Sequence, residues 1–131
     1  MHHHLTQEHL DALQRALQAH RLRLLREIAE HQHGKARVDA LIDEFRETGQ
    51  DWDLAPVFRD IEHAEVERDR GELAAVQAAL QRIVDGRFGS CIECGEPIPL
   101  ARLSAQPEAA RCIACQTRFE ARGGGATRAS L

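Results

Sequence analysis

The sequence predicts a mainly α-helical protein, in which a long antiparallel helical hairpin precedes a small four-cysteine module with a C-terminal helix. The chain has 131 residues with one Trp, four Phe and no Tyr. Leucine and alanine dominate instead, which favours helices packed against helices. Apolar residues recur at three- and four-residue spacing along most of the chain before Gly86, as on one face of a helix. The four cysteines fall in two Cys-x-x-Cys pairs after that point.

The first helix is expected to begin after Thr6, whose side chain can cap a helix N-terminus. Its apolar stripe weakens around Gly34. Because glycine costs about 1 kcal/mol relative to alanine inside a helix, we expect a kink or short break there. The stripe consists of Leu10, Leu13, Leu17, Leu24, Ile28, Val38, Leu41, Ile42 and Phe45.

Residues 48–56 contain a glycine, a proline and two aspartates, which predicts a turn that enters a second helix. Asp51 or Asp53 can cap that helix, and Pro56 is tolerated in its first turn. The second helix is expected from Leu54 to Asp85, with Gly86 as its stop. Residues 1–85 are therefore predicted to form the hairpin, with an acidic tip around 48–56. Residues 86–122 are predicted to form the four-cysteine module, and the glycine-rich tail at 123–131 is expected to be disordered.

Negative charge is concentrated in the middle of the chain. Residues 39–67 contain ten Asp or Glu against two Arg, a net charge of −8, whereas the whole chain carries −4. This balance argues against a protein that works mainly through phosphate contacts. A solvated helical surface explains the acidic block as readily as a functional tip does. No apolar run is long enough to span a membrane and no secretory signal is visible, so we expect a cytoplasmic protein.

The strongest functional signal is the spacing of Cys91, Cys94, Cys112 and Cys115. The two Cys-x-x-Cys pairs are separated by seventeen residues. A two-residue gap lets both sulfurs of a pair face one ion, and four thiolates complete a tetrahedral zinc site with no open position. We therefore predict one structural Zn²⁺, which folds a segment too short to build its own core. Two disulfides, a redox-active motif and an iron–sulfur cluster are the weaker alternatives.

The histidines show no such pattern. His20, His31, His33 and His63 share no spacing typical of a ligand set, so we expect them to face solvent or to be half-buried. His2, His3 and His4 can bind stray metal but are assigned no role.

The cysteines lie within a longer pattern. It runs Gly-Arg-Phe-Gly-Ser-Cys-x-x-Cys-Gly-Glu-Pro-Ile over residues 86–98, then Ala-Arg-Leu-x-Ala-x-Pro over 101–107 and Arg-Cys-x-x-Cys-Gln over 111–116. This pattern closely resembles the DksA/TraR family, densely from Gly86 to Glu120 and more weakly in the hairpin. The resemblance implies a non-enzymatic regulator that binds bacterial RNA polymerase. It also implies that the hairpin enters the secondary channel with its tip near the active centre, without sequence-specific DNA binding.

The resemblance also implies candidate contact residues. The family's tip motif is Asp-x-x-Asp-x-Ala, and the matching window here has Gln50, Asp53 and Ala55, with Asp51 beside the altered position. Asp51, Asp53 and Ala55 are thus the candidate polymerase contacts, although Asp53 can equally act as a helix cap.

Some family members respond to guanosine tetraphosphate through basic residues near the zinc. Here the aligned positions are the neutral Gln106 and Gln116. Without charge-assisted hydrogen bonds at these positions, we expect a weak or absent nucleotide response.

Two other classes fit parts of the sequence. A zinc module can bind nucleic acid directly, but residues 86–131 contain six Arg diluted by four Glu. A coiled-coil oligomer with a zinc cap is disfavoured because His20, His31 and Lys35 interrupt the apolar stripe, so we expect a monomer. No catalytic arrangement is legible, and an enzyme is the least favoured class.

Overall fold

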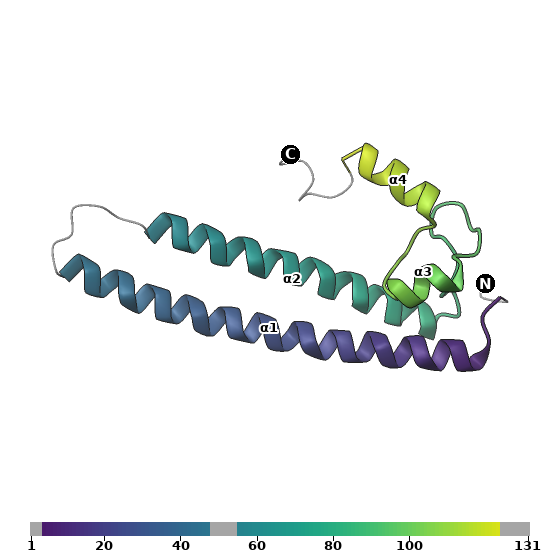
Figure 1. The fold of residues 1–131 in the computed structure, drawn as a ribbon, viewed down its shortest axis with the longest axis horizontal. Coiled ribbons are helices and arrows are strands. Elements are labelled where there is room, and N and C mark those ends of the chain that lie inside the picture. Colours follow the sequence, from purple (N-terminus) through teal and green to yellow (C-terminus); the bar gives the residue numbers. More distant parts are fainter. Residues whose placement is uncertain (1–3, 48–54, 124–131) are drawn as a thin grey trace. The chain divides into compact units, whose positions relative to one another are not determined.

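The computed structural model describes residues 4–47 and 55–123, with the backbone alone at 38, 42, 45–47 and 55–58. These residues form four helices, α1 (Gln7–Glu47), α2 (Ala55–Val84), α3 (Leu100–Ala105) and α4 (Ile113–Ala121) (Figure 1). Within the described ranges the β pairing consists of an isolated bridge between Ser90 and Pro97. The predicted mainly helical class is confirmed. The predicted tip at 48–56 lies outside the described residues up to Leu54, and the tail lies outside them from Gly124 onward.

Local capping fixes both the start of α1 and the end of α2. The backbone N–H of His9 donates to Thr6 Oγ1 at 3.1 Å, and the backbone N–H of Thr6 donates to His9 Nδ1 at 3.1 Å. Each residue thus satisfies a free amide of the other, as in a capping box. Gly86 ends α2 with a φ of +73°. Around it, the N–H of Arg87 donates to the Arg82 carbonyl at 2.8 Å and that of Gly86 to the Ile83 carbonyl at 3.2 Å, which is the Schellman pattern.

The predicted break at Gly34 is wrong, because α1 continues from Gln7 to Glu47 without interruption. A helix that is already formed on both sides propagates through a single glycine, whose penalty is only about 1 kcal/mol. The absence of a side chain at Gly34 makes room for a neighbouring residue. A Cβ atom at Gly34 would lie 3.2 Å from Glu62 Oε1, so glycine lets a carboxylate from α2 come close to the α1 backbone.

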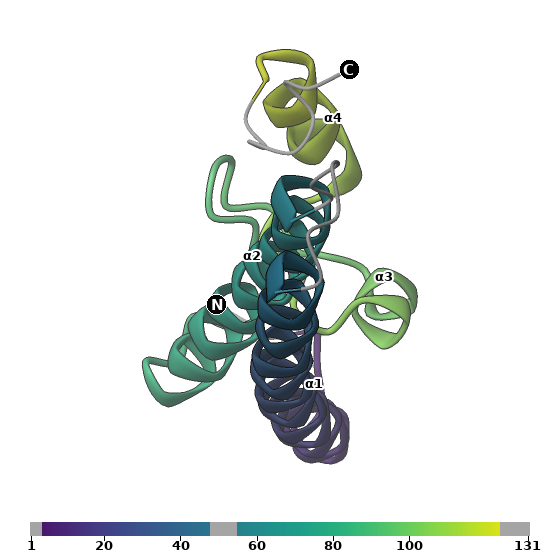
Figure 2. The same cartoon turned by 90° about the vertical axis from the view of Figure 1, so that its left-hand side faces the viewer.

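The chain divides into two compact units. We call residues 1–19 and 75–131 the base unit, and residues 20–74 the hairpin unit. The base unit contains both short helices, α3 and α4, which lie apart from each other (Figure 2). It also contains most of the described apolar core: Leu5, Leu13, Leu17, Val76, Ala79, Phe88, Ile98 and Leu103.

In the hairpin unit, α1 and α2 run antiparallel and side by side (Figures 1 and 2). Among its described side chains Leu24 is the buried apolar one, whereas Leu41 and Ile61 are 54% and 52% exposed. Polar contacts join the helices instead, including Arg59 Nε to Asp39 Oδ1 at 3.4 Å and His20 Nε2 to Glu72 Oε2 at 3.6 Å. The apolar stripe read from the sequence is therefore only partly used for burial.

The histidines of this unit lie as predicted. His20 and His31 are half-buried, and His33 and His63 are exposed. None of the helices in the part of the chain that the structure describes is both long and apolar enough to cross a membrane.

Gly71 offers a direct test of how the hairpin helices are stabilised. It lies inside α2, and a Cβ atom there would have no neighbour within 4 Å. Because alanine is about 1 kcal/mol more favourable than glycine in a helix interior, we expect Gly71→Ala to raise the free energy of unfolding by up to that amount in urea titrations followed by circular dichroism. Gly34→Ala is the matched control and should gain less, since Glu62 must move. Equal gains at the two positions would contradict this account.

Candidate metal centre

The first cysteine pair lies in a tight turn that the backbone closes on itself. The N–H of Cys91 donates to the Glu96 carbonyl at 2.8 Å, and the N–H of Gly95 donates to the Cys91 carbonyl at 3.0 Å. Gly95 has a φ of +76°, a conformation that strongly favours glycine. Gly95 therefore closes the turn, which holds Cys91 and Cys94 together.

The second pair is positioned by the start of α4. Cys112 is the N-cap of this helix, and its carbonyl accepts the N–H of Gln116 at 2.9 Å. Cys115 follows within the first turn, and residues three apart on a helix lie on the same face. A hydrogen bond of 2.9 Å from the N–H of Ile92 to the Ala110 carbonyl links this segment to the first turn.

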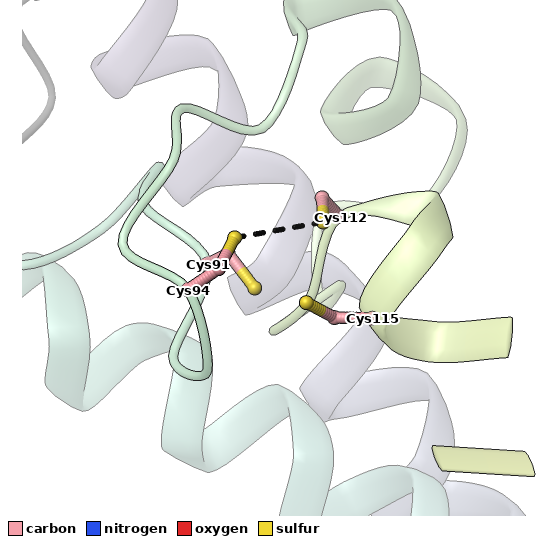
Figure 3. Close-up of side chains that lie close together, drawn as sticks. All are labelled: Cys91, Cys94, Cys112 and Cys115. Atoms are coloured by element: carbon pink, nitrogen blue, oxygen red, sulfur yellow. Dashed lines mark hydrogen bonds between the residues drawn. The ribbon is translucent and has the colours of Figure 1, made fainter. Parts of the chain in front are cut away.

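The four sulfur atoms converge from these two elements (Figure 3). All four lie within 4.8 Å of one another, and Cys94 Sγ is 3.8 Å from Cys112 Sγ. Four sulfurs about 2.3 Å from a tetrahedral zinc ion lie about 3.8 Å apart, so the donor set fits Zn²⁺. The cysteines are free rather than joined in disulfides. A set of four thiolates closes the coordination sphere, which makes such a site structural.

The electrostatics of the sulfurs favour a dication. Burial opposes ionisation of Cys91, but backbone hydrogen bonds from Cys94, Cys112 and Glu93 lower the pKa of its thiol to about 6. Burial, followed by hydrogen bonds with the other three sulfurs, raises the pKa of Cys115 to about 12. Thiolates packed this closely repel one another, and a bound Zn²⁺ removes that repulsion while it releases the remaining protons.

A positive side chain supports the set from outside. Arg118 Nη2 donates a hydrogen bond to Cys115 Sγ at 3.1 Å, and such outer contacts orient ligands and offset their charge. In the same segment of the chain, Phe88, Ile98 and Leu103 are at most 1% exposed. They give the module a small set of buried apolar side chains.

The other predicted site residues are placed as follows. Asp51 and Asp53 lie outside the described residues, and Ala55 begins α2 with no described side chain. Gln106 and Gln116 line one cavity of about 470 Å³ in the base unit.

Reasoning from the sequence missed a second cluster, in which His31 of α1 lies against Glu62 and Glu65 of α2. The one sign of this cluster in the local sequence is the spacing of the two glutamates, which lie three residues apart and so share one helix face. The approach of His31 depends on how the two helices are aligned, which the local pattern does not reveal.

Residues 86–121 match a family model described as the prokaryotic dksA/traR C4-type zinc finger. The RNA polymerase-binding transcription factor DksA of Caulobacter vibrioides is 45% identical over 56 residues, which cover 43% of this chain and 39% of that protein. The DksA protein of Escherichia coli is 38% identical over 56 residues, which cover 37% of that protein. The solved structure of DksA2 from Pseudomonas aeruginosa has 32% sequence identity over 87% of this chain and 88% of that one, with a TM-score of 0.49.

Residues 86–121 are a zinc finger of the DksA/TraR type. The four-sulfur centre is thus the C4-type zinc finger of this family, and its cofactor is a structural zinc ion. The matches between this chain and the curated DksA proteins span about two fifths of the length of those proteins. These relatives are named as transcription factors, which agrees with the expectation that the chain is not an enzyme.

The pKa values predict how zinc affinity changes with pH. Every thiol that is protonated before binding must lose its proton to the solvent. The pKa is about 6 for Cys91 and about 12 for Cys115. At neutral pH, zinc binding therefore displaces a proton from Cys115 but not from Cys91, which is already ionised. Below about pH 6, Cys91 is protonated as well, and zinc must displace its proton too. Zinc affinity therefore falls on acidification, more steeply below about pH 6 than above about pH 7. Competition with a chromophoric chelator across this range measures the slope, and one constant slope would contradict the prediction.

Proposed function

We propose that this protein is a non-enzymatic transcription regulator that binds bacterial RNA polymerase. In this proposal the turn between α1 and α2 enters the secondary channel and approaches the active centre. The observation that carries it is the agreement between two independent findings: the family model matches residues 86–121, and the same segment brings four cysteine sulfurs within 4.8 Å of one another. The DksA relatives are RNA polymerase-binding factors by name.

The charge of the hairpin supports a basic partner surface. Residues 39–67 carry a net charge of −8, and the described side chains of Asp60 and Glu67 are exposed. Opposite charge on a partner accelerates association and suppresses wrong orientations. A channel lined by basic groups is a partner of this kind, whereas a DNA backbone would be repelled.

The base unit also supports a protein partner rather than DNA. Arg111 Nε lies 3.1 Å from Glu93 Oε1, and its guanidinium stacks over the Phe119 ring at 3.7 Å. Arg102 Nε donates to the Arg111 carbonyl at 3.0 Å. Two arginines of the mildly basic segment are therefore committed to contacts within the unit. We infer that the protein acts in the cytoplasm, as a monomer and without sequence-specific DNA binding.

The tip is tested with Asp53→Ala in the zinc-loaded protein and purified bacterial RNA polymerase. We expect wild type to form a stoichiometric complex in native mass spectrometry and to change transcription from sensitive promoters. Asp53→Ala should still bind but should lose that effect, because the substitution removes a carboxylate placed near the active centre. Asp43→Ala is the matched control, since Asp43 is an exposed carboxylate on α1 outside the predicted tip.

Two results would contradict the proposal. Failure of the zinc-loaded wild type to bind polymerase would overturn it and would direct attention to nucleic-acid binding. Equal transcriptional effects of Asp53→Ala and wild type would remove Asp53 from the mechanism.

We further propose that guanosine tetraphosphate has little effect on this protein. The relevant cavity, of about 470 Å³, is lined by Arg102, Gln106, Arg111, Gln116 and Glu120, among others. Gln116 Nε2 donates to Glu120 Oε2 at 2.8 Å, so an acidic group stands beside one neutral position. The two arginines are held in the contacts described above. An anionic nucleotide would meet few free charge-assisted donors here.

The nucleotide proposal is tested by measuring polymerase affinity with and without guanosine tetraphosphate. We expect a change of less than about threefold for wild type, and a gain for the double variant Gln106→Lys/Gln116→Lys, because each lysine restores a charge-assisted contact. A large gain in the affinity of wild type would refute the proposal.

A further inference from the structure

One imidazole of α1 faces three carboxylates of α2 inside the hairpin unit. His31 Nδ1 lies 3.2 Å from Glu65 Oε2 and 3.5 Å from Glu62 Oε2. The other ring nitrogen, Nε2, lies 3.1 Å from Asp69 Oδ2. Glu62, Glu65 and Asp69 follow one another at intervals of three and four residues, which places all three on the same face of α2.

Two of these carboxylate oxygens are buried without a hydrogen-bond donor. Asp69 is 4% exposed and is the buried charged residue of the described chain. Asp69 Oδ2 and Glu62 Oε2 are both covered from solvent, and neither accepts a hydrogen bond. A buried carboxylate oxygen that has lost its water without gaining a donor is costly. The arrangement therefore calls for a positive group between these side chains.

We propose that His31 Nδ1, Glu62 and Glu65 bind a divalent transition-metal ion, distinct from the zinc of the cysteine centre. One ligand atom from each residue lies within 4.8 Å of the other two. An imidazole nitrogen with two carboxylate oxygens suits Zn²⁺ or Mn²⁺, whereas the soft thiolates of the finger select zinc.

Asp69 completes this arrangement as a positioning residue. When Nδ1 of a histidine binds a metal, the N–H at Nε2 usually donates to a carboxylate, which fixes the ring and increases its basicity. Asp69 Oδ2 lies 3.1 Å from His31 Nε2 but makes no hydrogen bond with it in this structure, and in the proposed site it accepts that N–H once Nδ1 holds the metal. A proton on His31 would offset one of the three nearby negative charges, whereas a dication offsets two and leaves the imidazole neutral.

Space and access fit a metal ion with additional water ligands. The cluster borders a cavity of about 460 Å³, which His31 and Glu62 line together with Lys35 and Arg70. Gly34 helps to admit the Glu62 carboxylate, since a Cβ atom there would lie 3.2 Å from Glu62 Oε1. Three protein ligands leave coordination positions for water, unlike the closed cysteine centre.

The test titrates the full-length protein, with its finger already saturated with zinc, with Mn²⁺. Free hexaaquo Mn²⁺ gives an electron paramagnetic resonance signal that disappears on binding. We expect one Mn²⁺ bound per chain and its displacement by Zn²⁺, because sites with nitrogen and oxygen ligands bind Zn²⁺ more tightly than Mn²⁺.

Four variants assign the site. His31→Gln and Glu65→Gln should each weaken Mn²⁺ binding by more than about tenfold, and Asp69→Asn should weaken it by about tenfold. His33→Gln is the matched control and should bind like wild type, since His33 is an exposed imidazole two residues away. Circular dichroism confirms that each variant remains helical, and Glu65→Gln provides the test if His31→Gln unfolds.

Two outcomes would overturn the proposal. Absence of Mn²⁺ binding up to millimolar concentration would mean that a proton on His31 holds the cluster together. Binding that His31→Gln and His33→Gln weaken equally would mean that ions collect only on the acidic surface.

Discussion

The convergence of four cysteine sulfurs on one tetrahedral centre is the constraint on which the zinc module depends. Besides Cys91 and Cys115, the buried apolar side chains of residues 86–121 are Phe88, Ile98 and Leu103. The two segments that carry the cysteines are linked by few backbone hydrogen bonds, such as Ile92 N–H to the Ala110 carbonyl at 2.9 Å. With so few buried apolar side chains in this segment, we expect its folding to be coupled to metal binding. The rest of the module follows from that coupling, including the start of α4 at Cys112 and the covered position of Cys115.

The hairpin unit is stabilised in a different way. Leu24 is its buried apolar side chain among those described, and histidines, arginines and carboxylates make several contacts between α1 and α2. Such contacts leave much of the surface charged, as an encounter with a basic partner requires. They also concentrate negative charge around His31, where a dication would relieve it. The same composition thus supports both the proposed partner and the proposed second metal site, through separate groups of residues.

Much of this architecture is readable from the sequence, because it rests on local rules. The cap at Thr6 and the stop at Gly86 depend on neighbouring backbone groups, and the cysteine spacing determines which sulfurs can meet. Gly34 was misjudged because a local propensity of about 1 kcal/mol is weaker than helix cooperativity. The cluster at His31 was missed because it depends on the alignment of two helices, which side-chain packing across the hairpin decides.

The central claim is that one zinc ion, bound by Cys91, Cys94, Cys112 and Cys115, folds the segment from 86 to 121. The most direct measurement is hydrogen–deuterium exchange of the reduced protein before and after a chelator removes zinc. The account predicts that the amides of Cys91, Ile92 and Gln116, which are hydrogen-bonded in the folded module, lose their protection when zinc is removed and recover it when zinc is restored. Protection that persists at these amides without zinc would contradict the claim.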